Sequence, residues 1–290
     1  MELFLTTLIN GLSLGGIYAM IALGYTMVYG IAKMLNFAHG DIIMVGGYTI
    51  YVFMATKNPF LAIFMAVLFC VILGILIEKI AYKPLRGASP LAVLITAIGV
   101  SYLLQSLALI IFKSASKTVT VFELKSVSLF GVPVQISALL TLAVTVVVMV
   151  VLTLFIKYTR LGRAMIAVSE DKGAAQLMGI NVNGIITVTF AIGSALAALA
   201  GLFLLMRAPN LTNTFGAMPG IKAFTAAVIG GIGSIPGAML GGILLGFVEC
   251  IAAKITVIAP YTDAIEFSIL IIILLVRPTG FLGKKRREKV

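Results

Sequence analysis

The chain has 290 residues, of which 61% are hydrophobic and only 11% are charged. Soluble domains carry about 25% charged residues, so this composition excludes a soluble protein and indicates a polytopic membrane protein. The net charge of +11 does not indicate a nucleic-acid partner, because no basic face is interleaved with aromatic residues and basic residues gather at the cytoplasmic ends of membrane spans.

Apolar runs of about twenty residues, the length that a helix needs to cross a bilayer, recur along the chain. We predict spans at about Leu3–Ile31, Leu35–Lys57, Phe60–Ile77, Leu91–Phe112, Ile136–Ile156, Gly184–Met206 and Ala264–Val276. The first contains Gly11 and Gly15, a pair of small residues that lets another helix approach closely. The last is short unless it starts earlier. Cys70 and Cys250 lie in apolar runs, which favours small buried side chains over a disulfide.

The apolar segment from Ile221 to Lys254 is interrupted at its centre. No continuous helix is expected to survive the glycines and proline that fall close together there, namely Gly230, Gly231, Gly233 and Pro236. We predict two half-helices that meet at this break, in the membrane and beside a water-filled path. The fold class is therefore all-α, a transmembrane bundle of about eight spans including this broken or re-entrant pair.

The segment from about residue 157 to 183 is a charged island between two apolar runs. Charges in the bilayer core cost roughly 2.5–3.5 kcal/mol each, so the island is expected to lie in water. Its apolar residues fall at helical spacing, Gly179 supplies a helix stop, and Gly173 predicts a bend or two short helices. The pattern leaves two interpretations open, a helix lying on the lipid surface and a helix that docks into a soluble partner.

The distribution of positive charge predicts the topology. With the N-terminus outside and the C-terminus in the cytoplasm, the inner side holds fourteen of the 21 basic residues. These are Lys33, Lys79, Lys83, Arg86, Lys157, Arg160, Arg163, Lys172, Arg277, Lys284, Lys285, Arg286, Arg287 and Lys289. The island is then cytoplasmic.

Several polar residues inside or beside the spans are candidates for lining a water-filled path through the membrane. Asn36, His39 and Asp41 precede an apolar run, where they form either an inner gate or a hydrogen-bonded turn, with Asp41 favoured as a first-turn acid. Glu249 lies within an apolar helix, where it either lines the path or forms a buried ion pair, for which Lys254 is in reach.

The spacing of Asp263 and Glu266 predicts a capping box at the start of the last span. No phosphate-binding loop occurs, and a single histidine makes a histidine metal cluster or a Ser-His-Asp triad improbable. We therefore expect no cofactor, no metal and no enzymatic activity.

Four stretches resemble the shorter permease subunit of the high-affinity branched-chain amino acid ABC importers. They are LNFAHGDIIMVGGY (35–48), GRAMIAVSEDKGAAQLMGINV (162–182), AAVIGGIGSIPGAMLGG (226–242) and LLVRPTGFLG (274–283). The resemblance covers essentially the whole chain and implies one transmembrane permease domain over residues 1–290.

The resemblance also implies partners and a location. The partners are a second permease in a heterodimer, ATP-binding subunits that carry out ATP hydrolysis, an external substrate-binding protein and membrane lipid. The location is a bacterial or archaeal inner membrane. In such permeases a short cytoplasmic helix sits in a groove of the ATPase, which implies an ATPase-coupling role for Arg163, Glu170, Asp171 and Gly179. Three alternatives stay open: a permease for urea or short amides, a proton-coupled carrier using Glu249 or Asp41, and a membrane scaffold.

Overall fold

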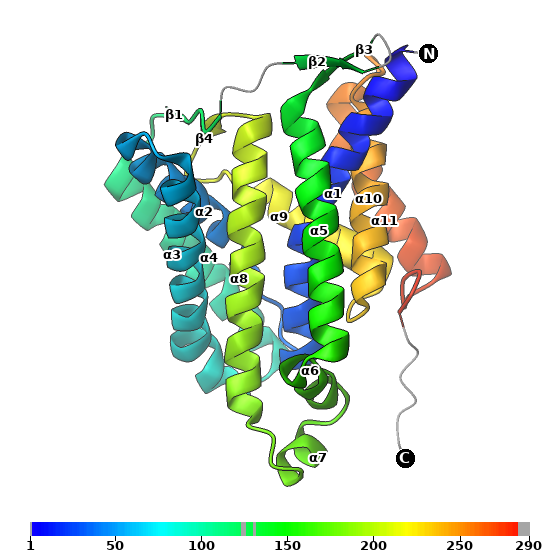
Figure 1. Ribbon diagram of the computed structural model, residues 1–290. Coiled ribbons are helices and arrows are strands. Elements are labelled where there is room, and N and C mark those ends of the chain that lie inside the picture. The colour runs from blue at the N-terminus through cyan, green and yellow to red at the C-terminus, as the bar shows by residue number, and fades with distance from the viewer. Residues whose placement is uncertain (1, 123–125, 130–131, 284–290) are drawn as a thin grey trace.

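The computed structural model describes residues 2–122, 126–129 and 132–283 and is a bundle of long helices (Figure 1). Nine helices of the described residues build the bundle: α1 (Glu2–Ala32), α2 (His39–Phe53), α3 (Pro59–Ile77), α4 (Pro90–Phe112), α5 (Ile136–Tyr158), α8 (Val182–Arg207), α9 (Ala217–Gly230), α10 (Ile235–Ala252) and α11 (Thr262–Val276). The basic tail from Lys284 onward, which contributes to the charge count, lies outside the described residues.

Seven helical segments of the described chain are long and apolar enough to cross a membrane. One of them joins α3 to the helical turns η2 (Glu78–Tyr82) and η3 (Lys83–Leu85), and another joins η4 (Ala259–Tyr261) to α11. Helices α2 and α9 are shorter, with 15 and 14 residues. The chain is therefore a multi-pass membrane protein, and the predicted all-α bundle is confirmed. The last span does start earlier than its apolar run.

Helix α1 is the centre of the bundle. In the most apolar stretch of α1, 89% of the residues are buried, against 17% in the corresponding stretch of α4 and 22% in that of α5. Helices α10, α8, α5 and α9 pack around it, and α3, α4 and α11 lie further out (Figure 1). The large exposed side chains of α3 and α5 are apolar except at the end of α5, where Lys157 lies, as acyl chains require.

Helices α1 and α10 touch backbone to backbone. A Cβ atom on Gly246 would lie 2.1 Å from the nitrogen of Gly15, and one on Gly15 would lie 2.7 Å from the Cα atom of Ile243. A Cβ atom on Gly11 would likewise lie 2.8 Å from the ring of Phe247. The close approach predicted for Gly11 and Gly15 is confirmed, and α10 is the partner helix.

Local sequence explains where several helices begin. The side chains of Asn58 and Ser89 accept hydrogen bonds from the backbone at the starts of α3 and α4, at 3.2 and 3.3 Å. A proline follows each of them at the first helical position, where the missing N–H group would have had no partner within the helix. Asn181 caps α8 in the same way, at 3.0 Å.

The second span differs from its prediction. Helix α2 begins only at His39, and residues 33–38 form a non-helical linker. Lys33 takes the left-handed conformation with φ 61°, which ends α1 and redirects the chain. The linker lies too deep among buried side chains to count as a surface loop, since Met34 and Asn36 are both buried.

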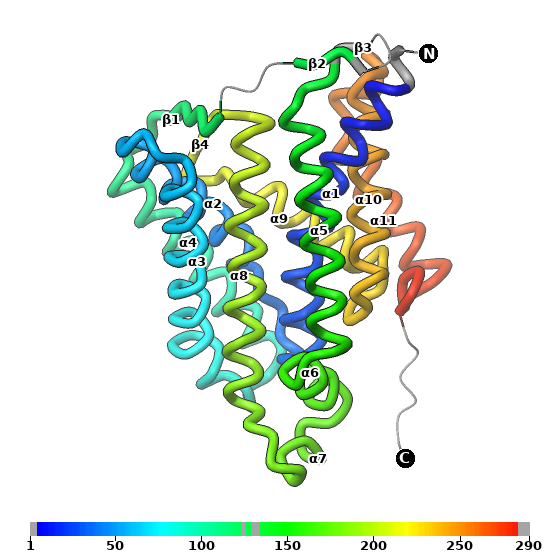
Figure 2. The backbone as a smooth tube through the Cα atoms, viewed as in Figure 1, coloured from blue at the N-terminus to red at the C-terminus, as the bar shows by residue number. Residues whose placement is uncertain are grey.

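The two ends of the bundle are unlike. One end carries two antiparallel strand pairs that were not predicted, β1 (Lys117–Thr118) with β4 (Asn210–Leu211) and β2 (Ser126–Leu129) with β3 (Val132–Gln135). The N-terminal end of α1 lies at this same end (Figure 2). Two short helices, α6 (Arg160–Glu170) and α7 (Lys172–Leu177), project at the opposite end (Figure 2).

Candidate functional site

The predicted break in the helix pair occurs, but it is short. Helix α9 ends at Gly230, and α10 starts at Ile235 with the Oγ atom of Ser234 accepting from the nitrogen of Gly237 at 3.2 Å. Gly231 and Gly233 between them have φ values of 105° and 93°, which other residues rarely adopt. Pro236 lies in the first turn of α10, where proline is tolerated, so the glycines after it stay helical.

A segment that follows α11 closes this break. The backbone nitrogens of Phe281 and Leu282 donate to the carbonyls of Ile229 and Gly230, each at 2.9 Å. Gly280 has a φ of 74°, and a Cβ atom there would lie 2.6 Å from the nitrogen of Gly231. We call residues 279–283 the strap. It supplies partners to carbonyls at the end of α9 that the helix itself leaves unpaired.

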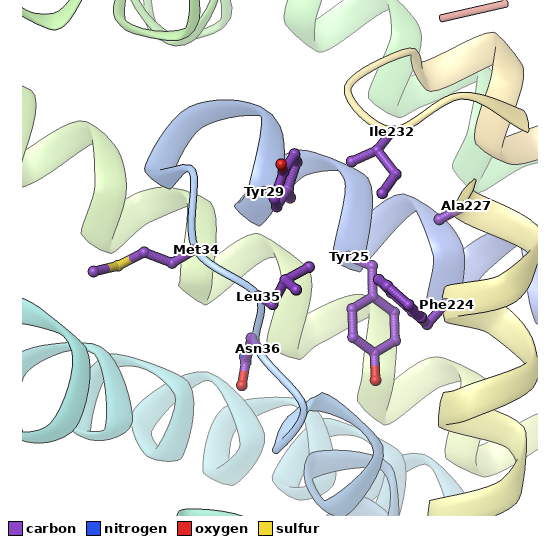
Figure 3. Close-up of a pocket in the computed structure, with 8 residues that line it drawn as sticks. All are labelled: Tyr25, Tyr29, Met34, Leu35, Asn36, Phe224, Ala227 and Ile232. Atoms are coloured by element: carbon purple, nitrogen blue, oxygen red, sulfur yellow. The ribbon is translucent and has the colours of Figure 1, made fainter. Parts of the chain in front are cut away.

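A small pocket lies beside the break, between α1, the linker and α9 (Figure 3). Its water-accessible volume is about 10 Å³, which is room for roughly one water molecule. Its lining comes from Tyr25, Tyr29, Met34, Leu35, Asn36, Phe224, Ala227 and Ile232. The side chain of Ile232 comes from the turn itself, so the pocket brings the predicted break together with Asn36.

Aromatic rings form one wall of this pocket. Tyr25 and Phe224 meet edge to face with ring centroids 5.7 Å apart, and Figure 3 shows them side by side. His39 packs against the other side of Tyr25 at 4.7 Å, and its Nε2 atom is buried without a hydrogen-bond partner. The wall is therefore apolar apart from the ends of its tyrosines.

The three polar candidates near the linker do not form a single cluster. The hydroxyl of Tyr82 donates to Asn36 Oδ1 at 2.9 Å, whereas Gln105 donates to Asp41 Oδ1 at 2.8 Å and His39 packs on Tyr25. Asp41 lies in the first turn of α2, as its favoured interpretation predicts. The structure thus supports the hydrogen-bonded turn more directly than a gate formed by all three.

A second polar site lies between α1, α9, α10 and α11. The ammonium group of Lys222 lies 3.1 Å from Glu249, 2.8 Å from Asp263 and 3.3 Å from Glu266. The hydroxyl of Tyr18 donates to Glu249 at 2.6 Å. The side chains of Lys222 and Glu266 are 7% and 0% exposed, but Asp263 is 52% exposed. We call these five residues the Lys222 cluster.

The Lys222 cluster bears on two predictions. Glu249 does form an ion pair, with Lys222 of α9. Asp263 and Glu266 do not form a capping box, because α11 starts at Thr262 without a side-chain cap and both acids turn toward Lys222. The carboxylates compensate the ammonium group of Lys222, which would be costly to bury without a partner.

The charged island folds into two helices. Asp171 ends α6, and its carboxylate caps α7, accepting from the nitrogens of Gly173 and Ala174 at 2.8 and 3.0 Å. Gly179 then ends this second helix with a φ of 81°. The predicted interruption near Gly173 and the predicted stop at Gly179 are confirmed. Arg163 and Glu170 are exposed on α6.

One face of the island is buried, whereas Leu177 and Met178 at its end are exposed; we call these two residues the bare tip. Met165 and Val168 on α6 are each 1% exposed and pack into the bundle. A Cβ atom on Gly162 would lie 2.4 Å from the backbone of Ile156, so α6 folds back tightly against the end of α5. Leu177 and Met178, in contrast, are 90% and 82% exposed. Large apolar side chains so exposed at a polar end are typical of a protein contact.

The comparisons with known proteins cover the whole of this arrangement. The family described as the permease component of branched-chain amino acid transport systems matches residues 7–274. The chain belongs to this family. A high-affinity branched-chain amino acid permease protein of Pseudomonas aeruginosa, BraD, is 45% identical over 99% of the chain and 98% of its own length. LivH of Escherichia coli K12 is 41% identical over the same shares, and a probable LivH of Methanocaldococcus jannaschii is 30% identical over 91% and 88%.

Two parts of the permease's polar framework could not be assigned from the pattern alone. Lys222 stands within an otherwise apolar run, IKAFTAAVIGG, and that isolated charge was the available signal. The pairing of Glu78 with Arg86 and Thr187 had no such signal, because it joins η2 and the segment after it to α8. Glu78 is fully buried there, at the start of η2. Tyr82, at the end of η2, donates to the linker residue Asn36.

Proposed function

We propose that the permease forms half of the translocation path of an ATP-driven importer for branched-chain amino acids. Full-length relatives in two bacteria and an archaeon bear that substrate class in their names, and their similarity extends through the helices and both polar ends. The proposed path runs beside the α9–α10 break, along Asn36, His39, Asp41 and Glu249. Non-helical backbone at membrane depth is tolerated only within protein or beside a water-filled path.

The observation that carries the proposal is the bare tip of the two-helix island. In this scheme α6 and α7 fit a groove of an ATPase subunit, with Leu177 and Met178 as apolar contacts and Glu170 facing basic residues. The chain itself hydrolyses no ATP. The remaining partners are a second permease subunit and an external substrate-binding protein.

The charge bias supports an orientation in a bacterial or archaeal inner membrane with the N-terminus outside. The island then lies in the cytoplasm, where ATP is, and the strand pairs lie outside, where a binding protein would dock. Residues 1–290 act as one transmembrane domain, with the coupling loop at about 157–183 and the broken pair at about 221–254.

Gentle purification of the tagged permease, followed by reconstitution into liposomes, tests this function. We expect ATPase subunits and a second permease to co-purify, and the liposomes to take up leucine only with ATP and the binding protein. Urea uptake under the same conditions is the control for the related substrate class. Leucine uptake without any ATPase, driven by a proton gradient, would contradict the proposal.

A further inference from the structure

A side chain from the island holds the end of the central helix. The Nζ atom of Lys172, the first residue of α7, donates to the carbonyl of Ala32 at 2.8 Å. Ala32 is the last residue of α1. The final carbonyls of a helix have no partner within it, and a positive charge there is favourable with the helix dipole. Lys172 therefore caps α1 from 140 positions further along the chain.

The same end of α1 forms part of the pocket. Tyr29 lines the pocket one turn before Ala32, and Met34 to Asn36 line it directly afterwards. The capped carbonyl thus lies between two segments that both contribute lining side chains. A shift of Ala32 would move Tyr29 and the linker together, because Lys33 fixes the turn between them.

Lys172 moves with the island because its backbone is fixed at the start of α7. The cap by Asp171 determines the first turn of that helix, and α6 and α7 pack on each other. Partial burial, followed by the nearby positive charge of Arg86, lowers the pKa of Lys172. A charged donor in such a partly desolvated position binds a carbonyl more strongly than it would in open water.

We propose that Lys172 transmits movement of α6 and α7 to the α1–α2 linker and thereby changes the pocket beside the α9–α10 break. This rests on the proposed function, in which an ATPase subunit displaces the island. Lys172 acts through the end of α1, so it is a positioning residue and does not contact the transported amino acid.

The test compares transport with ATP hydrolysis in the reconstituted complex. We expect Lys172→Met to leave ATPase co-purification and basal hydrolysis near the wild-type level. Uptake per ATP hydrolysed should fall about tenfold, the factor expected for loss of one charge-assisted hydrogen bond. Lys172→Arg, which can still donate, should restore most of the coupling. Lys83→Met is the matched control, because Lys83 is exposed on η3, outside the island.

A second readout follows the pocket itself. The thiol of Leu35→Cys should react with a small polar reagent at different rates with and without ATP, and Lys172→Met should abolish that difference. If Lys172→Met fails to assemble, Lys172→Gln, which is too short to reach Ala32, takes its place. Unchanged uptake per ATP together with an unchanged ATP effect on Leu35→Cys would overturn the inference. Absence of ATP-dependent uptake in the wild-type complex would overturn the proposed function instead.

Discussion

Single residues determine how the helices pack at two kinds of position, where a charge is buried and where two backbones touch. Lys222 is the clearest case, because one ammonium group holds three carboxylates from two other helices. An isolated charge costs several kcal/mol in a low-dielectric interior, and its partners share that cost. The cluster therefore couples the positions of α9, α10 and α11.

Removing Lys222 should destabilise the permease strongly. We expect Lys222→Met to cost about 3–5 kcal/mol, because it leaves the buried carboxylate of Glu266 uncompensated. Thermal unfolding in detergent measures the loss. Adding Glu266→Gln to Lys222→Met should recover part of it, since Glu266 is the fully buried acid. Equal melting of the single variant and the wild type would show that the cluster is hydrated and energetically neutral.

Glycine has a comparable role where α1 meets α10. Gly246→Val should lower stability by about 1–3 kcal/mol, because the new side chain would overlap the backbone of Gly15. Gly99→Val is the matched control in an exposed part of α4, since a Cβ atom on Gly99 meets nothing within 4 Å. The two melting temperatures in detergent can be compared directly, and a similar effect of both would contradict the packing argument.

At the scale of elements, helix boundaries set by local chemistry could be predicted, whereas contacts between residues far apart in the sequence could not. Asn58-Pro59 and Ser89-Pro90 predict helix starts because cap and proline act within one turn. The end of α1 was predicted to within one residue, at Ile31 against the observed Ala32, but the cap that Lys172 places on it could not be predicted. Lys222 was missed as a partner of Glu249 because it also comes from a distant helix. The short strands were not predicted either, since two or four residues are too few to show an alternation of apolar and polar side chains.

The proposed function predicts that the island binds an ATPase subunit through its bare tip. We expect Leu177→Asp to reduce ATPase co-purification at least several-fold, because a carboxylate would be buried without a partner in the contact. Val257→Asp is the control, since Val257 is 81% exposed in the connection between α10 and α11, away from α6 and α7 in the chain. Undiminished co-purification of Leu177→Asp would remove the tip from the contact.

The cap at the start of α7 limits which substitutions can test the charge of the island's acids. Asp171→Lys would also destroy the N-cap of α7, so a loss of coupling would be ambiguous. Asp171→Asn keeps an equally good cap and removes only the charge. If charge attracts the ATPase, Asp171→Asn combined with Glu170→Lys should weaken attachment while α7 stays folded, as hydrogen exchange of its amides would report.

At the scale of the whole molecule, the outer faces differ in polarity. The exposed faces of α3 and α5 are apolar, whereas the start of α11 presents Asp263, more than half exposed, beside Glu249. Hydrocarbon does not tolerate such a charge, so this side is expected to meet water or another protein.

The orientation can be tested from both sides. A membrane-impermeant thiol reagent should label Thr120→Cys in intact cells, and Leu177→Cys only after the membrane is opened. Both positions are exposed, while the native Cys70 and Cys250 are buried and should give little background. The reverse pattern of labelling would invert the proposed topology.

The strap carries a consequence for biosynthesis. Ile229 and Gly230 emerge from the ribosome long before Phe281 and Leu282, whose amides occupy their carbonyls in the finished protein. Until the strap has been synthesised, these two carbonyl groups at the end of α9 are either unpaired or hydrogen-bonded to water. The hairpin of α9 and α10 therefore reaches its final form only after α11 has been inserted, which makes the order of insertion part of how the break is built.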